Sequence, residues 1–272
     1  MPTSRSEPST RPSGAADPGY RPAMAVLVGV HGAFHEYWGP HQLRSRWLPA
    51  VLDGLAQAGR TVADADVAFP FYGDIFRPTI ATGRPTDEEV REIARVAGFL
   101  DFLEERFGSE GWEAFAEEIG RERLRHLVAQ LGRYFTDPDL RAVVRERVDA
   151  TIGPDTRVVV AHSMGTVVAY EVLASRPDHA VDTFVTLGSP LGGEFVRSRV
   201  DPPPATVESM VRRWVNVAAI DDDVVREPNL ARWFGAVEDV RVDNGPDAHR
   251  AEPYLNAAVT GRAMADGLSA GA

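Results

Sequence analysis

Apolar residues along the 272-residue chain gather in short runs, and segments with a helix-like spacing of apolar residues lie between most of these runs. Short, uninterrupted apolar runs are typical of strands buried on both faces of a parallel sheet. Alternating strands and helices therefore predict an α/β fold, with a mainly parallel sheet flanked by helices. The predicted strands cover residues 23–30, 61–71, 157–160, 182–188, 213–220 and 239–243.

Two further segments carry apolar residues at helical spacing. Within residues 41–59, Leu43, Trp47 and Leu48 begin a stripe of the kind that buries one face of a helix. Residues 251–268 show a similar pattern after the last apolar run, and they predict the closing helix of the chain.

The middle of the chain contains three longer helical patterns. The first covers residues 86–107 and opens with Thr86 and Glu89, a pair that forms a capping box at a helix start. The second covers residues 112–131. The third starts with Asp137 as the N-cap residue, followed by a proline at the first helical position.

These three patterns predict a helical insertion, residues 86–150, within a single domain of residues 23–272. The insertion carries more than half of the chain's net charge of −11. Its helices either pack over the sheet with a solvated outer face or form a cap over a site. Residues 1–22, rich in proline, serine and glycine, predict a flexible N-terminal tail.

Composition excludes several classes of chemistry. The chain has no cysteine and no lysine, so disulfides, thiolate zinc sites, cysteine nucleophiles and Schiff bases are excluded. The net charge of −11 argues against nucleic acid as a partner. We expect a cytoplasmic protein, because no stretch approaches the length of a membrane span and the N-terminus lacks the apolar segment of a secretory signal.

One serine stands where a predicted strand turns directly into a predicted helix. In the stretch VVVAHSMGTVVAYEVL, Ser163 follows a valine run, with the small residues Ala161 and Gly165 two positions before and after it. Small residues at these positions let strand and helix approach closely in a nucleophile elbow, whose usual pattern is G-x-S-x-G. The simpler alternative is a serine that caps a helix.

A nucleophilic serine needs a base and an orienting acid, which follow it along the chain in the order acid, then histidine. Of the two histidines after the serine, His179 lies at the wrong end of the sheet, whereas His249 lies between the last strand and the last helix. Asp222 fits the acid best at the end of a predicted strand. Asp221 and Asp223 remain alternatives, and a polar turn is the simpler interpretation of each.

Two backbone N–H groups are candidates for an oxyanion hole. One belongs to Met164, directly after the serine. The other belongs to Ala33, in the loop after the first strand, where Gly32 permits a tight turn. We expect His31 to hold this loop by hydrogen bonds, and we do not expect His31 and His35 to form a metal pair.

Aromatic residues follow the early strands, and they either line a substrate pocket or belong to the hydrophobic core. Phe34, Tyr37 and Trp38 are the substrate-binding candidates. The same two interpretations apply to Phe71, Tyr72 and Phe76.

Five motifs resemble the lipase-like α/β-hydrolase superfamily, in particular bacterial serine hydrolases related to the inositol-deacylase and lipase branch. They are VGVHGAF, VVAHSMGTVVAYEVL, TLGSPLGG, WVNVAAIDDDVV and HRAEPYL. The resemblance implies an α/β-hydrolase fold and an esterase or lipase that needs no cofactor and no metal. It implies a triad of Ser163, Asp222 and His249, with Ala33 and Met164 at the oxyanion hole.

The predicted function is cleavage of a small-molecule carboxylic ester through an acyl-enzyme. A thioesterase or acyltransferase with the same triad, a serine peptidase, and a non-catalytic binding module that keeps the fold are the alternatives. The pattern of residues leaves the oligomeric state and the acyl chain length open.

Overall fold

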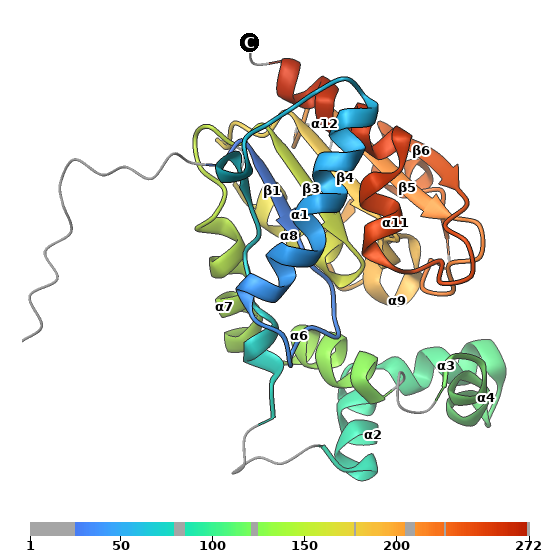
Figure 1. Ribbon diagram of the computed structural model, residues 1–272. Coiled ribbons are helices and arrows are strands. Elements are labelled where there is room, and N and C mark those ends of the chain that lie inside the picture. The colour runs from blue at the N-terminus through green and yellow to red at the C-terminus, as the bar shows by residue number, and fades with distance from the viewer. Residues whose placement is uncertain are drawn as a thin grey trace, which may run out of the picture.

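The computed structural model of the protein describes residues 25–78, 85–120, 125–176, 178–204, 210–225 and 227–270. These residues form a six-stranded sheet in the order β2-β1-β3-β4-β5-β6 (Figure 1). Every neighbouring pair of strands is parallel, so the predicted α/β fold is confirmed. The strands are β1 (Leu27–Val30), β2 (Val67–Ala68), β3 (Val158–His162), β4 (Thr183–Leu187), β5 (Arg213–Ala219) and β6 (Val237–Val242).

Helices α1 (Pro40–Gln57), α11 (Ala251–Asn256) and α12 (Ala258–Ser269) cover one face of the sheet (Figure 1). Val158 and Val160 of the central strand β3 lie in the apolar core beneath them. Successive side chains of a strand point to opposite faces, so every second valine of the run serves this core.

Helices α8 (Met164–Ala174) and α7 (Pro138–Asp149) cover the opposite face. The other side chains of the same strand, Val159 and Ala161, lie in this second core. All five residues of β3 are buried, which explains why the strand reads as an unbroken apolar run.

The prediction of a strand over residues 61–71 is wrong except for β2. Asp64–Asp66 forms a 3₁₀ turn, η1, and only Val67–Ala68 pairs with β1. Aspartate favours turns, and Pro70 has no N–H to donate to a ladder. The first strand starts at Leu27 rather than at residue 23, and residues 1–24 lie outside the described part of the chain.

The predicted helix over residues 86–107 is two helices, α2 (Asp87–Val96) and α3 (Phe99–Phe107). Gly98 breaks the pattern with a left-handed φ of 69°. A side chain at this position would meet the guanidinium of Arg199 at 2.6 Å. The predicted capping box is present, since Glu89 N–H donates to Thr86 Oγ1 at 3.2 Å and Thr86 N–H donates to Glu89 Oε2 at 2.7 Å.

The rest of the middle block departs from the predicted pattern in one place. The second pattern divides into α4 (Gly111–Ile119) and a later stretch, which contains the π-helical turn η3 (Val128–Gly132) and α6 (Arg133–Thr136). The N-cap of α7 is as predicted, because Leu140 N–H donates to Asp137 Oδ1 at 3.0 Å. We call α2, α3, α4, η3, α6 and α7 the helical block.

The helical block has two parts. Figure 1 shows α7 beside the sheet, while α2, α3 and α4 project beyond the edge where α1 begins. Because α1 follows β1, that edge carries the carboxyl ends of the strands, where ligands bind in parallel sheets. There the Phe99 ring of α3 lies 4.9 Å from that of Phe195 in α9 (Glu194–Arg197).

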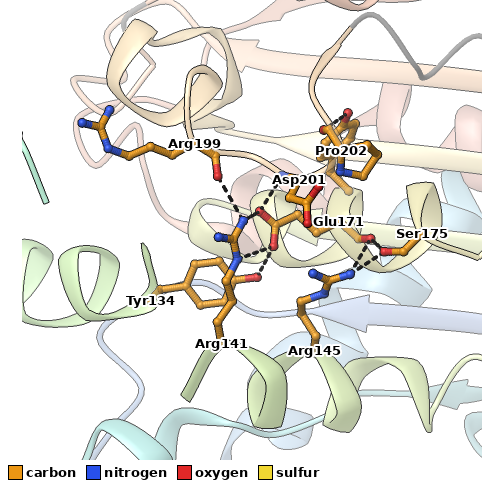
Figure 2. A network of polar contacts seen from close by, with 9 residues as sticks. Tyr134, Arg141, Arg145, Glu171, Ser175, Arg199, Asp201 and Pro202 are labelled. Atoms are coloured by element: carbon orange, nitrogen blue, oxygen red, sulfur yellow. Dashed lines mark hydrogen bonds and ion pairs between the residues drawn. The ribbon is translucent and has the colours of Figure 1, made fainter. Parts of the chain in front are cut away.

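A buried carboxylate ties the helical block to helix α8 (Figure 2). Glu171 of α8 is fully buried, and it accepts hydrogen bonds from Tyr134 Oη at 2.7 Å and from Arg141 Nε at 3.0 Å. Arg141 also donates to the carbonyl of Arg199 at 3.0 Å. Arg199 Nε in turn donates to the Ala97 carbonyl at 2.9 Å, so the network reaches the junction of α2 and α3.

The predicted closing helix of residues 251–268 is also two helices, α11 and α12, because Ala257 adopts an extended ψ of 137°. Among the described residues, none of the helices combines the length and apolar character needed to span a bilayer. The remaining short helices are η2 (Gly73–Phe76), η4 (Pro190–Gly192) and α10 (Ala231–Phe234).

Candidate active site

Ser163 occupies a strained turn between β3 and α8. Its φ of 55° and ψ of −131° lie in a region that residues with a side chain seldom adopt. A Cβ on Gly165 would meet the His31 carbonyl oxygen at 2.4 Å, and a Cβ on Gly32 would meet Ser163 Cβ at 2.6 Å. Gly165 is therefore required by the close approach of α8 to the loop after β1, and Gly32 by the close approach of that loop to the serine.

The carboxyl edge of the sheet brings Ser163, His249 and Asp222 together in a continuous hydrogen-bonded line. His249 Nε2 lies 2.9 Å from Ser163 Oγ. His249 Nδ1 lies 2.9 Å from both carboxylate oxygens of Asp222. The serine precedes α8, the aspartate follows β5, and the histidine follows β6, so three separate chain segments meet here.

The environment of Asp222 favours its ionised form. Burial opposes ionisation, but hydrogen bonds from His249, from Tyr254 Oη at 2.7 Å and from Val224 N–H at 3.0 Å hold the pKa of Asp222 below its usual value. Burial raises the pKa of the Tyr254 phenol, which remains a donor. A buried carboxylate with this set of donors fixes the imidazole in the tautomer that carries hydrogen on Nδ1.

The two neighbouring aspartates point elsewhere. Asp221 and Asp223 are exposed, whereas Asp222 is buried. Asp222 lies in the turn after β5, which ends at Ala219, and in this turn its carboxylate contacts His249.

Comparison with known proteins adds little to this geometry. No protein-family model matches the chain, and no curated protein sequence matches it. Among solved structures, the chain is similar to the crystal structure of the esterase domain of a protein from Rhodothermus marinus. The two are 14% identical, the match covers 90% of this chain and 86% of that chain, and the TM-score is 0.40.

The loop after β1 lies against the serine and is held by His31. Burial, with the neighbouring His35, lowers the pKa of His31 well below its usual value, so the ring is neutral. His31 Nδ1 donates to the Gly32 carbonyl at 2.7 Å, and Tyr72 N–H donates to His31 Nε2 at 3.2 Å. The Tyr72 hydroxyl also donates to the His31 carbonyl. His31 therefore holds the loop by hydrogen bonds, as predicted.

Of the two predicted oxyanion residues, Met164 directly follows Ser163, and Ala33 follows Gly32, which lies against the serine. Met164 is the first residue of α8, where backbone N–H groups have no partner within the helix. Ala33 is buried in the loop. Its neighbour Gly32 has no side chain, and the Gly32 backbone therefore lies against the serine. His35 Nδ1 donates to the Ala33 carbonyl at 2.7 Å, so the His35 ring is hydrogen-bonded to the backbone of the same loop.

The three substrate-binding candidates divide into exposed and packed side chains. Phe34 and Tyr37 are 38% and 47% exposed. Trp38 packs against the core beneath α1, with its ring 4.6 Å from that of His35. Tyr37 also lines a cavity of about 600 Å³ between the loop and the helical block.

The aromatic residues of the next loop serve mainly as packing. Tyr72 and Phe76 are buried in the core beneath α8, although Phe76 also lines the cavity of about 600 Å³. Phe71 packs against the opposite core, and its ring centroid lies 5.3 Å from that of His31.

Three residues near the line of hydrogen bonds have roles that sequence reasoning missed. Tyr254 donates to Asp222, and Gly188 leaves the space in which Asp222 lies, since a Cβ there would meet its Oδ2 at 2.8 Å. His162 Nε2 donates to the His249 carbonyl at 2.8 Å, and burial lowers the pKa of His162 well below its usual value. Tyr254 and Gly188 stand in the motifs HRAEPYL and TLGSPLGG, but only the fold shows what they contact.

Within the described residues there is no group of three or more histidine, aspartate or glutamate side chains that could hold a metal ion. His179 lies between α8 and β4, at the opposite end of the sheet from Ser163.

Proposed function

We propose that the protein is a serine hydrolase that cleaves carboxylic esters. The observation that carries the proposal is the line from Ser163 Oγ through His249 to Asp222, with 2.9 Å at each junction and the serine in a strained elbow. A nucleophile bonded to a base, and a base bonded to an orienting acid, form the arrangement that acyl transfer requires.

In the first half of the proposed reaction, His249 Nε2 accepts the Ser163 proton while the serine oxygen bonds to the ester carbonyl carbon. Asp222 holds the ring orientation and stabilises the imidazolium that forms. The oxyanion accepts hydrogen bonds from the N–H groups of Ala33 and Met164. The imidazolium then returns its proton to the departing alcohol, which leaves an acyl-serine.

In the second half, a water molecule takes the place of the alcohol. His249 accepts a proton from this water as it bonds to the acyl carbon, and the same two N–H groups stabilise the second oxyanion. Collapse returns the proton to Ser163 and releases the carboxylic acid. None of these steps calls for a group beyond the named side chains and N–H groups.

The substrate class follows from the resemblance of the motifs to the lipase-like branch that includes inositol deacylases. Exposed Phe34 and Tyr37 are proposed to contact the acyl or alcohol part of the substrate. Helices α2, α3 and α4 are proposed to act as a cap, because α3 contacts α9 at the carboxyl edge. A shortened variant that lacks α3 and α4 and still folds should favour bulky esters over small ones more than the parent does. An unchanged preference would overturn the cap.

Steady-state hydrolysis of a panel of p-nitrophenyl esters, acyl thioesters and peptides tests the proposal. Ser163→Ala should lower ester hydrolysis by several orders of magnitude. Ser175→Ala is the matched control, because Ser175 lies at the other end of α8 and should leave the rate unchanged. A Ser163→Ala variant that keeps more than about a tenth of the parent rate would show that Ser163 is not the nucleophile. Faster turnover of thioesters or peptides would assign a different substrate class.

A further inference from the structure

Phe34, in the loop that carries Ala33, has a backbone conformation that needs external support. Its φ is 67°, and among the described non-glycine residues only Ser163 shares a positive φ. A left-handed conformation is unfavourable for a residue with a side chain. The Phe34 N–H belongs to the peptide unit that directly follows Ala33, so a group that holds this N–H also fixes the backbone on one side of the proposed oxyanion donor.

The support comes from Gln130, far along the chain in the helical block. Gln130 Oε1 accepts a hydrogen bond from Phe34 N–H at 3.2 Å, and Gln130 Nε2 donates to Glu36 Oε2 at 2.8 Å. Gln130 is 5% exposed and Glu36 is 4% exposed. A backbone N–H can only donate and a carboxylate can only accept, so a single orientation of the Gln130 amide satisfies both partners.

The local helix geometry singles out the same residue. Gln130 is the middle residue of η3, a π-helical turn in an otherwise α-helical stretch. Such turns are rare and occur frequently at functional sites. The turn also packs closely on α2, since a Cβ on Gly132 would meet Ile93 Cγ2 at 2.7 Å.

Glu36, the carboxylate that Gln130 contacts, has a second neighbour in the helical block. His126 Nε2 lies 3.7 Å from Glu36 Oε1, and its ring packs edge-on at 6.0 Å from the Phe34 ring. Residues of one helical stretch therefore hold both sides of the loop, at Phe34 and at Glu36.

We propose that Gln130 is a positioning residue for the oxyanion hole, acting through Phe34 and Glu36. This inference rests on the proposed function. The amide bridge fixes the left-handed turn at Phe34, and the turn directs the Ala33 N–H toward the carbonyl oxygen of a substrate bonded to Ser163. The helical block is then part of the active site, and its attachment at η3 governs transition-state stabilisation rather than substrate binding.

The test uses Gln130→Met, Gln130→Glu, Glu36→Gln, and the double variant Gln130→Glu with Glu36→Gln. Gln130→Met has similar size and no hydrogen-bonding amide. Gln130→Glu brings two carboxylates together. The double variant exchanges donor and acceptor, so a carboxylate at position 130 can accept from both Phe34 N–H and the new amide at position 36.

We expect kcat for ester hydrolysis to fall about ten- to a hundredfold in Gln130→Met and Gln130→Glu, less than the loss of a whole oxyanion donor. KM should change little, and affinity for a boronic acid that bonds to Ser163 as a tetrahedral adduct should fall with kcat. The double variant should recover most of the loss. Tyr134→Phe is the control: it removes a buried hydrogen bond four residues further on without touching the loop, so it should keep the parent kcat.

Three results would overturn the inference: a Gln130→Met variant with the parent kcat, a loss expressed in KM alone, or a double variant no better than Gln130→Glu. Hydrogen–deuterium exchange of the Phe34 amide separates this outcome from failure of the proposed function. If the parent hydrolyses no ester, the proposed function fails. Faster exchange in Gln130→Met than in Tyr134→Phe would still support the hold on the loop, and equal exchange would refute it.

Discussion

Helix α8 joins two polar networks that contain similar groups. At its start, Asp222 accepts from Tyr254 at 2.7 Å and from His249 at 2.9 Å. Along its length, Glu171 accepts from Tyr134 at 2.7 Å and from an arginine at 3.0 Å (Figure 2). Each network therefore consists of a buried carboxylate, a tyrosine hydroxyl and a side chain with nitrogen donors.

The nitrogen-containing side chain makes the difference between the two networks. A histidine exchanges its proton near neutral pH, whereas an arginine stays charged. His249 directs its free ring nitrogen toward Ser163 Oγ, while Arg141 ends on the carbonyl of Arg199. The first network is suited to proton transfer, and the second to attachment of the helical block. Changes in the first should alter turnover, and changes in the second should alter stability.

The largest expected effect is on turnover in Asp222→Asn. The asparagine amide favours the wrong tautomer of His249, so kcat for ester hydrolysis should fall about 10³- to 10⁴-fold. Asp221→Asn changes an exposed neighbour and should leave kcat unchanged. Steady-state kinetics on one ester compares the two variants. Equal losses in both would mean that the hydrogen bond to His249 has no special role.

Glu171→Ala tests the other half of the comparison. It leaves Arg141 half-buried without its carboxylate, and breaking a buried ion pair in this way costs about 3–5 kcal/mol of unfolding free energy. Urea unfolding measures the change. Glu113→Ala removes an exposed ion pair with Arg91 in the same block and should change stability little. A Glu171→Ala protein of parent stability with strongly reduced kcat would reverse the assignment of the two networks.

Gly98→Ala tests the far end of the attachment network. The left-handed φ of 69° costs alanine about 1 kcal/mol, and the new methyl group displaces Arg199 from the Ala97 carbonyl. Gly59→Ala is the matched control, since Gly59 also follows the C-cap residue of a helix, its φ is 72° and a Cβ there meets nothing within 4 Å. Thermal unfolding should show the greater loss for Gly98→Ala. Equal losses would mean that the Arg199 contact contributes nothing to stability.

A smaller effect concerns the pH dependence of stability. The pKa of Asp222 is lower in the folded protein than its usual value, so its ionisation stabilises the fold above the unfolded pKa. That contribution is lost as the pH falls through the folded pKa. The stability difference between parent and Asp222→Asn should therefore shrink from about pH 5 to pH 2. Urea unfolding at a series of pH values measures this difference, and a difference that grows toward low pH would contradict the account.

Much of the fold follows from the sequence because burial on both faces leaves an unmistakable pattern. The valine run of β3 and the small residues around Ser163 record constraints that act within a few positions. The sequence narrows the acid after β5 to three aspartates, and the position just past the strand end, followed by x-Val-Val, favours Asp222 among them.

Other features depend on contacts between distant parts of the chain. A glycine after α2 is a local signal for a helix end, but nothing in the local pattern shows that Arg199, more than a hundred residues later, fills the space beside it. Gln130 looks like one more polar position in an amphipathic helix, and its bridge to Phe34 exists only once the block folds onto the loop. The short β2 was overpredicted because apolar content outweighed the turn-forming aspartates.

The central claim is that Ser163 is a nucleophile activated by His249, and a fluorophosphonate probe tests it most directly. Mass spectrometry of the labelled protein should find the probe on Ser163, with no labelling in Ser163→Ala and much slower labelling in His249→Gln. Thermal unfolding of each variant verifies that the fold is retained. Labelling of His249→Gln at the parent rate, or an intact parent protein that takes up no probe at Ser163, would contradict the account.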